Sequence, residues 1–208
     1  AKVGVVAIAL AVGLGIPAGI VSALKRNTIV DRVIMFITTL GIAMPSFIVA
    51  TLLLYLFGVN LGWVKTVGIQ GFSSYILPAF SLAFYPMSYI SRRMRSHMWV
   101  ALGQDYIRTA RAKGMSQRVV LYKHALRNSI IPVITYLGPV AAGILTGGFV
   151  VEKIYSIPGL GQYFVNSITG RDYPMVMGTT IFLAALIILI NLVVDIFYCI
   201  IDPRIKLD

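Results

Sequence analysis

The segment ALGQDYIRTARAKGMSQRVVLYKHALRNSIIP, residues Ala101–Pro132, decides how the rest of this chain is organised. It is the only long polar stretch in a very apolar sequence, and it holds a single acidic residue, Asp105. Its basic residues are Arg108, Arg111, Lys113, Arg118, Lys123 and Arg127. This composition predicts a surface segment between two apolar elements.

The same segment predicts two short helices joined by a glycine turn. Asp105 would stabilise the start of the first helix, and basic residues crowd its end, as the helix dipole favours. Gly114 then provides a left-handed stop, and Ser116 can cap the second helix through its hydroxyl. That second helix has Val119, Tyr122 and Leu126 on one side, and of these Val119 and Leu126 would pack on this chain or on a partner.

The overall composition excludes an ordinary soluble domain. Hydrophobic residues make up 58% of the chain and charged residues 12%, and the mean hydropathy is +0.87. The net charge of +11 does not indicate nucleic-acid binding, because the basic residues lie in loops between apolar runs. We therefore expect an all-α polytopic membrane protein.

Five stretches are long and apolar enough to cross a bilayer, for which a helix needs about 20 residues. They are Val3–Leu24, Val33–Phe57, Phe72–Ile90, Ile130–Val151 and Val176–Ile201. Gly41 and Pro45 predict a kink in the second stretch, and Pro78 and Pro86 make the third the least regular. The many small residues of the first and fourth predict close helix packing inside the bundle.

The distribution of basic residues predicts the orientation. Fourteen of the eighteen Lys and Arg residues fall on one side of a five-span arrangement, which the positive-inside rule makes cytoplasmic. That side includes Ala101–Pro132 and the C-terminus, whereas the outer side holds only Lys2, Lys65, Lys153 and Arg171. The same arrangement puts Ala1 outside, so we expect one further span upstream and six in the full protein.

The outer loop Glu152–Pro174 predicts a short amphipathic helix. Its apolar residues recur at helical spacing: Ile157, Leu160, Tyr163, Phe164 and Ile168. Such a helix either clamps two spans together at the membrane surface or dips into the mouth of a transport pathway. The sequence does not separate these alternatives.

Few residues offer chemistry of their own. The chain has no Gly-x-x-x-x-Gly-Lys-Ser/Thr phosphate loop, so any movement driven by ATP must enter through a partner. His97, His124 and Cys199 lack metal-ligand spacing, and Asp195 is the one acid that the sequence places inside a span. A proton-coupled secondary transporter, the alternative reading, would be expected to carry several such acids or histidines; a membrane enzyme would need paired catalytic groups.

Several ordered segments give the chain a resemblance to one transporter family. Arg108–Ala110, Gly114, the HALRN run from His124 to Asn128, and Pro132 resemble the cytoplasmic loop of binding-protein-dependent ABC importers. They are most similar to the oligopeptide, dipeptide and nickel branch, and closest to the first permease subunit of its oligopeptide importers. Further similar segments are Ser22–Arg32, Met44–Ala50, Ile154–Pro174 and Asn191–Ile205. Arg108 and Thr109 depart from the general Glu-Ala pattern, and Arg127 stands where a proline would.

This resemblance implies a type I ABC importer permease fold, in which residues 1–208 form one transmembrane domain. Residues 101–132 would be the cytoplasmic coupling loop and residues 152–174 an extracytoplasmic loop. The implied partners are a second permease subunit in a heterodimer, two ATPase subunits, an extracytoplasmic substrate-binding protein and membrane lipid, with no nucleic acid. The chain would be non-catalytic and hold no cofactor or metal, because ATP and Mg²⁺ would bind the ATPases. We expect a bacterial inner-membrane location and peptide substrates, with dipeptides and nickel chelates left open.

Two sets of candidate site residues follow. Residues implied to couple the chain to an ATPase are Ala110, Gly114, Met115, Ser116, Gln117, His124 and Leu126. Candidates for lining the pathway are Tyr85, Tyr89, Tyr136 and Asn166. Each pathway candidate is equally explained as a buried or interfacial aromatic residue or a satisfied amide.

Overall fold

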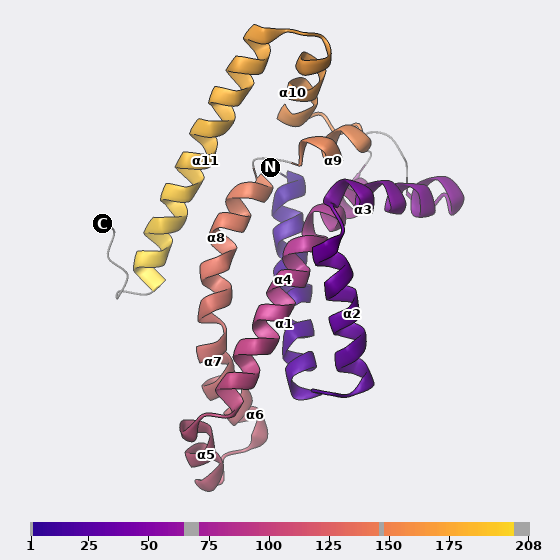
Figure 1. Cartoon of the computed structure of the whole chain (residues 1–208). Coiled ribbons are helices and arrows are strands. Elements are labelled where there is room, and N and C mark those ends of the chain that lie inside the picture. Colours follow the sequence, from indigo (N-terminus) through magenta and orange to yellow (C-terminus); the bar gives the residue numbers. More distant parts are fainter. Residues whose placement is uncertain (1, 65–70, 146–147, 202–208) are drawn as a thin grey trace. The chain divides into compact units, whose positions relative to one another are not determined.

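A computed structural model describes residues 2–64, 71–145 and 148–201, which form helices and their connections without a strand among them. The helices are labelled in Figure 1, and the chain divides into two compact units. The first comprises the described parts of Ala1–Leu10, Met44–Phe84 and Gly138–Asp208, and the second comprises Ala11–Ala43 and Tyr85–Leu137. The all-helical architecture agrees with the predicted fold class.

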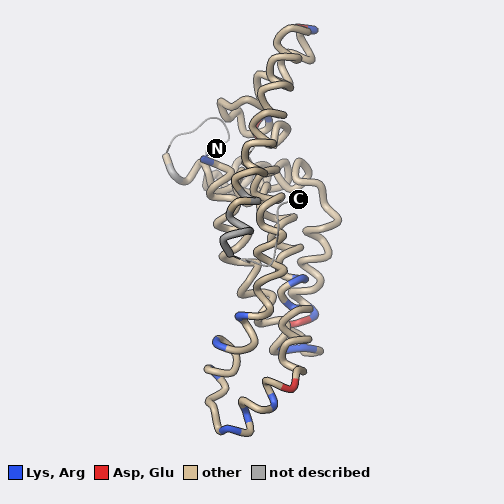
Figure 2. The backbone as a smooth tube through the Cα atoms, turned by 90° about the vertical axis from the view of Figure 1, so that its left-hand side faces the viewer, with Lys and Arg blue, Asp and Glu red and all other residues tan. Residues whose placement is uncertain are grey.

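The second unit carries the polar segment. It contains most of α1 (Lys2–Leu24), α2 (Ile29–Ala43), most of α4 (Ile76–Leu102), α5 (Asp105–Ala112), α6 (Gln117–Val119), the π-helical η3 (Val120–Ala125), α7 (Leu126–Ser129) and the start of α8 (Ile131–Leu145). Its largest fully buried apolar side chains are Ile90, Met94, Met98, Ile107, Val120 and Val133. In Figure 2 the Lys and Arg positions of this unit gather toward the end that carries α5.

The first unit contains the remaining elements. They are α3 (Ser46–Leu53), the π-helical η1 (Leu54–Asn60), the 3₁₀ turn η2 (Phe72–Tyr75), α9 (Phe149–Ile154), α10 (Leu160–Thr169) and α11 (Tyr173–Ile201), with the first turns of α1 and α4 and the end of α8. Within this unit α10 packs against both α9 and α11, and α3 packs against α9.

The first and fifth predicted spans are single helices. α1 and the Tyr173–Val193 part of α11 are long and apolar enough to cross a membrane. Two further pairs of helices are each interrupted by a break, and if each pair is one span, the described residues contain up to four spans. The predicted number of five is therefore still a prediction. The fourth stretch is helical as α8 up to Leu145, and residues 146–147, which it includes, lie outside the described part of the chain.

Proline acts differently in the second and third stretches. α2 ends at Ala43 and α3 begins at Ser46, so the second stretch is broken at Pro45 rather than kinked, because proline lacks an N–H and disfavours helix in the residue before it. The predicted interruption of the third stretch by Pro78 and Pro86 is wrong, since α4 runs unbroken through both, although the stretch begins as the 3₁₀ turn η2. Pro78 lies in the first turn of α4, where its missing N–H has no intrahelical partner to lose.

Close packing of α1 on α4 fixes the core of the second unit. A Cβ atom on Gly15 would lie 2.8 Å from the Met87 carbonyl oxygen, and one on Gly19 would lie 2.5 Å from that of Ser91. Real Cβ atoms do not approach so closely, so only glycine permits this contact. The predicted small-residue packing of the first span is confirmed here.

Candidate coupling site and charged clusters

The first helix of the polar segment, α5, begins as the sequence predicts. Asp105 lies in its first turn and Arg111 in its last, as the helix dipole favours. The Asp105 carboxylate accepts a hydrogen bond from Arg108 at 3.4 Å, and both side chains are strongly exposed. Such a pair adds little stability, so α5 depends on its buried residues for its position.

The turn after α5 is built around Gly114. α5 ends at Ala112, and Gly114 has a φ of 75°, a left-handed conformation that costs other residues about 1–2 kcal/mol. The Gly114 N–H donates to the Arg111 carbonyl at 3.0 Å, and the Met115 N–H donates to the Ala110 carbonyl at 3.3 Å. The predicted left-handed stop is confirmed, and backbone hydrogen bonds close the turn.

The three residues after Gly114 are exposed. Ser116 occupies the predicted cap position, with φ −60° and ψ 147°, but its hydroxyl makes no capping hydrogen bond. That hydrogen bond was wrongly predicted, although the cap position is confirmed. Met115, Ser116 and Gln117 therefore present their side chains outward at the tip of the segment.

The second helix of the segment is not a regular α-helix. α6 leads into the π-helical η3, in which each N–H bonds to a carbonyl five residues back. Val120 and Ala125, five residues apart, are fully buried, whereas Val119 and Tyr122 are 41% and 61% exposed. The wider turn thus changes which residues pack inward, and the expected set of Val119, Tyr122 and Leu126 does not form the packing face within this chain.

Buried contacts hold the segment against the end of α4. Ile107 and Ala110 of α5 are buried, and α5 packs on η3. The Ser129 hydroxyl donates to the Ala125 carbonyl at 2.8 Å and lies 3.5 Å from the sulfur of Met98 in α4. The tip at Gly114 consequently stands on a packed base that is joined to α4.

The predicted coupling residues fall into two groups. Gly114, Met115, Ser116 and Gln117 form the exposed tip, and Ala110 lies beneath it as the acceptor for Met115. His124 and Leu126 are half-buried on η3 and α7, and no side-chain hydrogen bond joins His124 to another described residue. The structure therefore brings together the residues from Ala110 to Gln117 and places the other two on the base.

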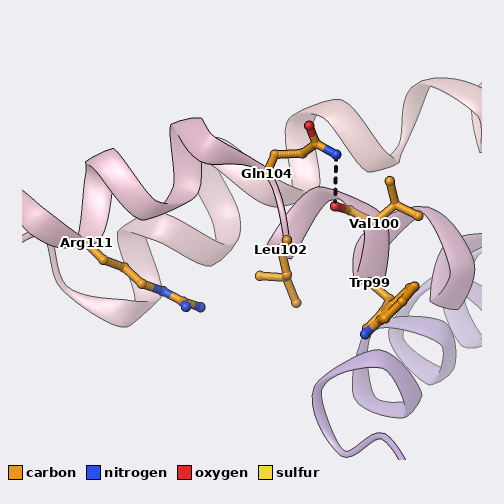
Figure 3. Close-up of a pocket in the computed structure, with 6 residues that line it drawn as sticks. Trp99, Val100, Leu102, Gln104 and Arg111 are labelled. Carbon is orange, nitrogen blue, oxygen red and sulfur yellow. Dashed lines mark hydrogen bonds between the residues drawn. The ribbon is translucent and has the colours of Figure 1, made fainter.

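A groove lies where α4 passes into α5 (Figure 3). Its volume is about 500 Å³, and it is lined by Trp99, Val100, Leu102, Gly103, Gln104 and Arg111. The Gln104 side-chain amide donates to the Val100 carbonyl at 3.5 Å. On Trp99, the guanidinium of Arg26 lies 3.8 Å from the ring centroid, a cation–π contact between the α1–α2 connection and α4.

A buried ion pair joins α2 and α4 near the same end. Asp31 is 3% exposed, and its two carboxylate oxygens accept hydrogen bonds from Nε and Nη2 of Arg95, each at 2.8 Å. The same carboxylate accepts from the Ser22 hydroxyl of α1 at 2.5 Å and from the Asn27 N–H at 2.9 Å. One carboxylate therefore ties α1, the α1–α2 connection, α2 and α4 together.

Sequence reasoning missed this cluster. Arg95 is only one of the fourteen basic residues that the sequence places on the cytoplasmic side, and Asp195 is the one acid that it places inside a span. Asp195 has a side chain outside the described part of the structure. The available signal was that Asp31 is the only acidic residue before Asp105, in a region with many arginines.

Three of the four candidate pathway residues come together in the second unit. Tyr89 lies between Tyr85 and Tyr136, with ring-centroid distances of 6.4 Å and 4.2 Å. Arg93, one turn after Tyr89 on α4, donates to the Tyr89 hydroxyl at 2.5 Å, and its guanidinium lies 4.9 Å from the ring centroid. The sequence analysis did not single out Arg93, although its spacing from Tyr85 and Tyr89 puts all three on one helix face.

The fourth candidate, Asn166, belongs to the first unit, in the segment 152–174 that the sequence predicts to be an outer loop. Its side-chain oxygen accepts a hydrogen bond from Lys153 Nζ at 2.7 Å, and the residue is exposed. The predicted short helix is confirmed as α10, but Tyr163 and Ile168 are 61% and 51% exposed. The apolar residues of α10 therefore do not form a common buried face within the chain.

Glu152 fixes the start of α10. Its carboxylate accepts a hydrogen bond from the Gly161 N–H at 3.0 Å. Burial raises the pKa of the Glu152 carboxyl, and the hydrogen bond from Gly161 opposes that shift only in part. The Tyr155 hydroxyl, three residues later, donates to the Ala50 carbonyl of α3 at 3.0 Å and anchors the same loop.

Within residues 2–64, 71–145 and 148–201, no group of three His, Cys, Asp or Glu side chains could hold a metal ion. The described chemistry is therefore that of ion pairs, aromatic contacts and an exposed helical turn.

Comparison with known proteins identifies the family. A family model described as "Binding-protein-dependent transport system inner membrane component" matches residues 15–207. The chain is 48% identical over 206 residues to the dipeptide transport system permease protein DppB of Bacillus subtilis, covering 99% of this chain and 67% of that protein. It is 45% identical over 207 residues to the oligopeptide transport system permease protein OppB of Haemophilus influenzae and 43% identical over 208 residues to that of Escherichia coli K12; each match covers 99% of this chain and 68% of the relative. Together with the apolar helices, these similarities show that the chain belongs to the family of inner-membrane components of binding-protein-dependent transport systems.

Proposed function

We propose that this chain is the permease subunit of an ATP-driven, binding-protein-dependent importer of peptides. Peptides are the proposed substrates because the similar proteins are named for dipeptide or oligopeptide transport. The chain would form part of the pathway across a bacterial inner membrane and carry no catalytic site or cofactor of its own. ATP and Mg²⁺ would bind the partner ATPases.

One structural observation supports the coupling role most directly. The tip Gly114–Gln117 is exposed, yet it rests on the buried Ala110 and on the packed base that joins α4. A partner that displaced this tip would therefore displace the end of a long helix rather than a free loop. Coupling of ATP hydrolysis to the pathway requires such a connection, since a ligand or partner shifts a conformational equilibrium only through contacts that differ between states.

The proposed assembly contains a second permease subunit, two ATPase subunits and an extracytoplasmic binding protein. Residues 101–132 and the C-terminus would face the cytoplasm, because most basic residues of the chain accompany them. Residues 152–174 would face outward and meet the binding protein. Membrane lipid would cover the remaining apolar surface.

The test is reconstitution of the transporter with its partner subunits in proteoliposomes. We expect the ATPases to co-purify with this chain and uptake of labelled peptide to require ATP hydrolysis. A proton ionophore should leave that uptake unchanged. Uptake that needs a proton gradient but no ATP would instead support a proton-coupled secondary transporter.

The range of substrates is tested separately on the partner binding protein. Calorimetric titration with dipeptides, longer peptides and nickel chelates should show binding of peptides. Binding of nickel chelates alone would contradict the proposed substrate class while leaving the family membership intact.

A further inference from the structure

The aromatic and cationic cluster on α4 and α8 is the strongest feature that the coupling role leaves unexplained. It consists of Tyr85, Tyr89 and Arg93, spaced four residues apart on α4, and Tyr136 of α8. The guanidinium of Arg93 lies 4.9 Å from the ring centroid of Tyr89 and 6.0 Å from that of Tyr136. Tyr85, Tyr89 and Arg93 thus follow one another over about 12 Å of α4, and the Tyr136 ring is tilted against that of Tyr89.

Arg93 differs from its neighbours in its partners. Arg95 is paired with buried Asp31, and Arg92 donates to the Thr39 hydroxyl at 2.8 Å. No described carboxylate lies within 4 Å of Arg93, and its one side-chain hydrogen bond goes to Tyr89. A guanidinium has five N–H donors, so most of the hydrogen-bonding capacity of Arg93 is left for a ligand.

The position of Arg93 limits what that ligand can be. Arg93 lies about 13 Å before the end of α4, on an exposed face of a helix in an apolar chain. The guanidinium is exposed and lies beside the rings of Tyr89 and Tyr136, where an anionic ligand can reach it. An oxyanion satisfies it best, because a carboxylate or phosphate can accept two parallel hydrogen bonds from one guanidinium.

The tyrosines favour a peptide over a lipid as the source of that oxyanion. The hydroxyls of Tyr85 and Tyr136 make no hydrogen bond with any described residue, and Tyr85 is 45% exposed. Acyl chains lying along the rings would leave these hydroxyls unsatisfied, whereas peptide amides can pair with them. The rings themselves can contact apolar side chains.

We propose that Arg93 binds the C-terminal carboxylate of a peptide in transit, with Tyr85, Tyr89 and Tyr136 contacting the residues that precede it. This inference rests on the proposed function and names a recognition site within it. Arg93 would make the pathway prefer peptides with a free C-terminus. The preference would be additional to any selection by the binding protein.

The test compares uptake of a labelled tripeptide with uptake of its C-terminal amide in the complete reconstituted transporter. The binding protein is the same for every variant, so its own preference cancels in the comparison. Arg93→Gln should lower the ratio of free-acid to amide uptake at least about tenfold, as expected for loss of a charge-assisted hydrogen bond. Arg93→Lys, which keeps the charge but not the planar fork, should give an intermediate ratio.

Arg32→Gln is the matched control, because Arg32 is an exposed arginine of the same unit without an ion pair among the described residues. Its ratio should equal that of the wild type. If Arg93→Gln lowers the uptake of both peptides equally, or of neither, the carboxylate site is overturned. An effect of Arg93→Gln that appears only in vesicles containing anionic phospholipid also overturns it and assigns Arg93 to lipid phosphate.

A crosslinking measurement keeps the inference testable if Arg93→Gln fails to assemble. A photoreactive benzoylphenylalanine at position 85, with Arg93 intact, should crosslink to the labelled free-acid peptide during turnover. Crosslinking to lipid without peptide would overturn the site. If the wild type takes up peptide but Arg93→Gln has the same ratio of free-acid to amide uptake, the site is overturned and the proposed function stands. If the wild type takes up neither peptide, the proposed function itself is contradicted.

Discussion

Arg95 of α4 binds Asp31 of α2 through two parallel hydrogen bonds of 2.8 Å, with the Asp31 side chain almost fully buried. The Ser22 hydroxyl and the Asn27 N–H donate further hydrogen bonds to the same carboxylate. Because α4 leads directly into α5, this pair fixes the helix that leads to the exposed tip Gly114–Gln117. The cluster therefore connects α1 and α2 to the segment 101–132, which would move when a partner ATPase moves.

Removing one partner of this pair should be costly. Asp31→Asn leaves the Arg95 guanidinium without its counter-charge, which for a buried pair costs about 3–5 kcal/mol. We expect a clear fall in the thermal unfolding temperature of the purified transporter in detergent. Asp105→Asn is the matched control, because it removes the same charge from an exposed pair that is worth about 1 kcal/mol or less. Equal effects of the two substitutions would contradict the proposed clamp.

The left-handed turn at Gly114 should be required for coupling. Gly114→Val introduces a β-branched side chain at a φ of 75°, so the tip must either strain or change shape. We expect ATP hydrolysis by the partner subunits to continue while peptide uptake falls severalfold, measured on the same vesicles. Gly13→Val is the control and should keep uptake, because a Cβ atom added to Gly13 would meet no atom of another helix within 4 Å. Unchanged uptake in Gly114→Val would refute the hinge assignment.

The contact between α1 and α4 at Gly19 should not tolerate a larger residue. In Gly19→Leu the new side chain would meet the Ser91 carbonyl and Met94, and overpacking of this kind costs about 1–3 kcal/mol or more. The expected result is a lower yield of folded protein and a lower unfolding temperature. Gly13→Leu supplies the comparison on the same helix, and similar loss in both variants would show that the α1–α4 contact is not the cause.

The packing of α9 and α10 should become less stable as pH rises through the raised pKa of Glu152. The folded state holds the proton more tightly than the unfolded state, so the contribution of Glu152 is most favourable at low pH and declines between its ordinary pKa and its raised pKa. Hydrogen exchange of the α9 and α10 amides, corrected for intrinsic exchange rates, should therefore accelerate with pH in that window.

Two variants check this assignment to Glu152. Glu152→Gln cannot ionise and should remove the pH dependence of α9 and α10. Asp172→Asn changes a nearby exposed carboxylate that accepts from the Met175 N–H, and it should leave the dependence in place. A pH dependence that persists in Glu152→Gln would contradict the assignment.

Local chemistry determined much of this protein from the sequence alone. Apolar length fixed α1 and α11, Asp105 and Gly114 fixed the start and stop of α5, and helical spacing indicated α10. These features depend on residues close together in the chain, so their physical causes can be read without a structure. The ordered motifs around Gly114 likewise pointed to the family that the comparisons show.

Tertiary structure decided what depends on residues far apart. Asp31 meets Arg95 sixty-four positions later, and Tyr89 meets Tyr136 across two helices. The π-helical turn at η3 moved Val120 and Ala125 inward, and Pro45 broke a helix where Pro86 did not. Helix periodicity does not predict such outcomes. The partners of a freed carbonyl or a buried charge lie on other helices, so they are known only once the helices have packed.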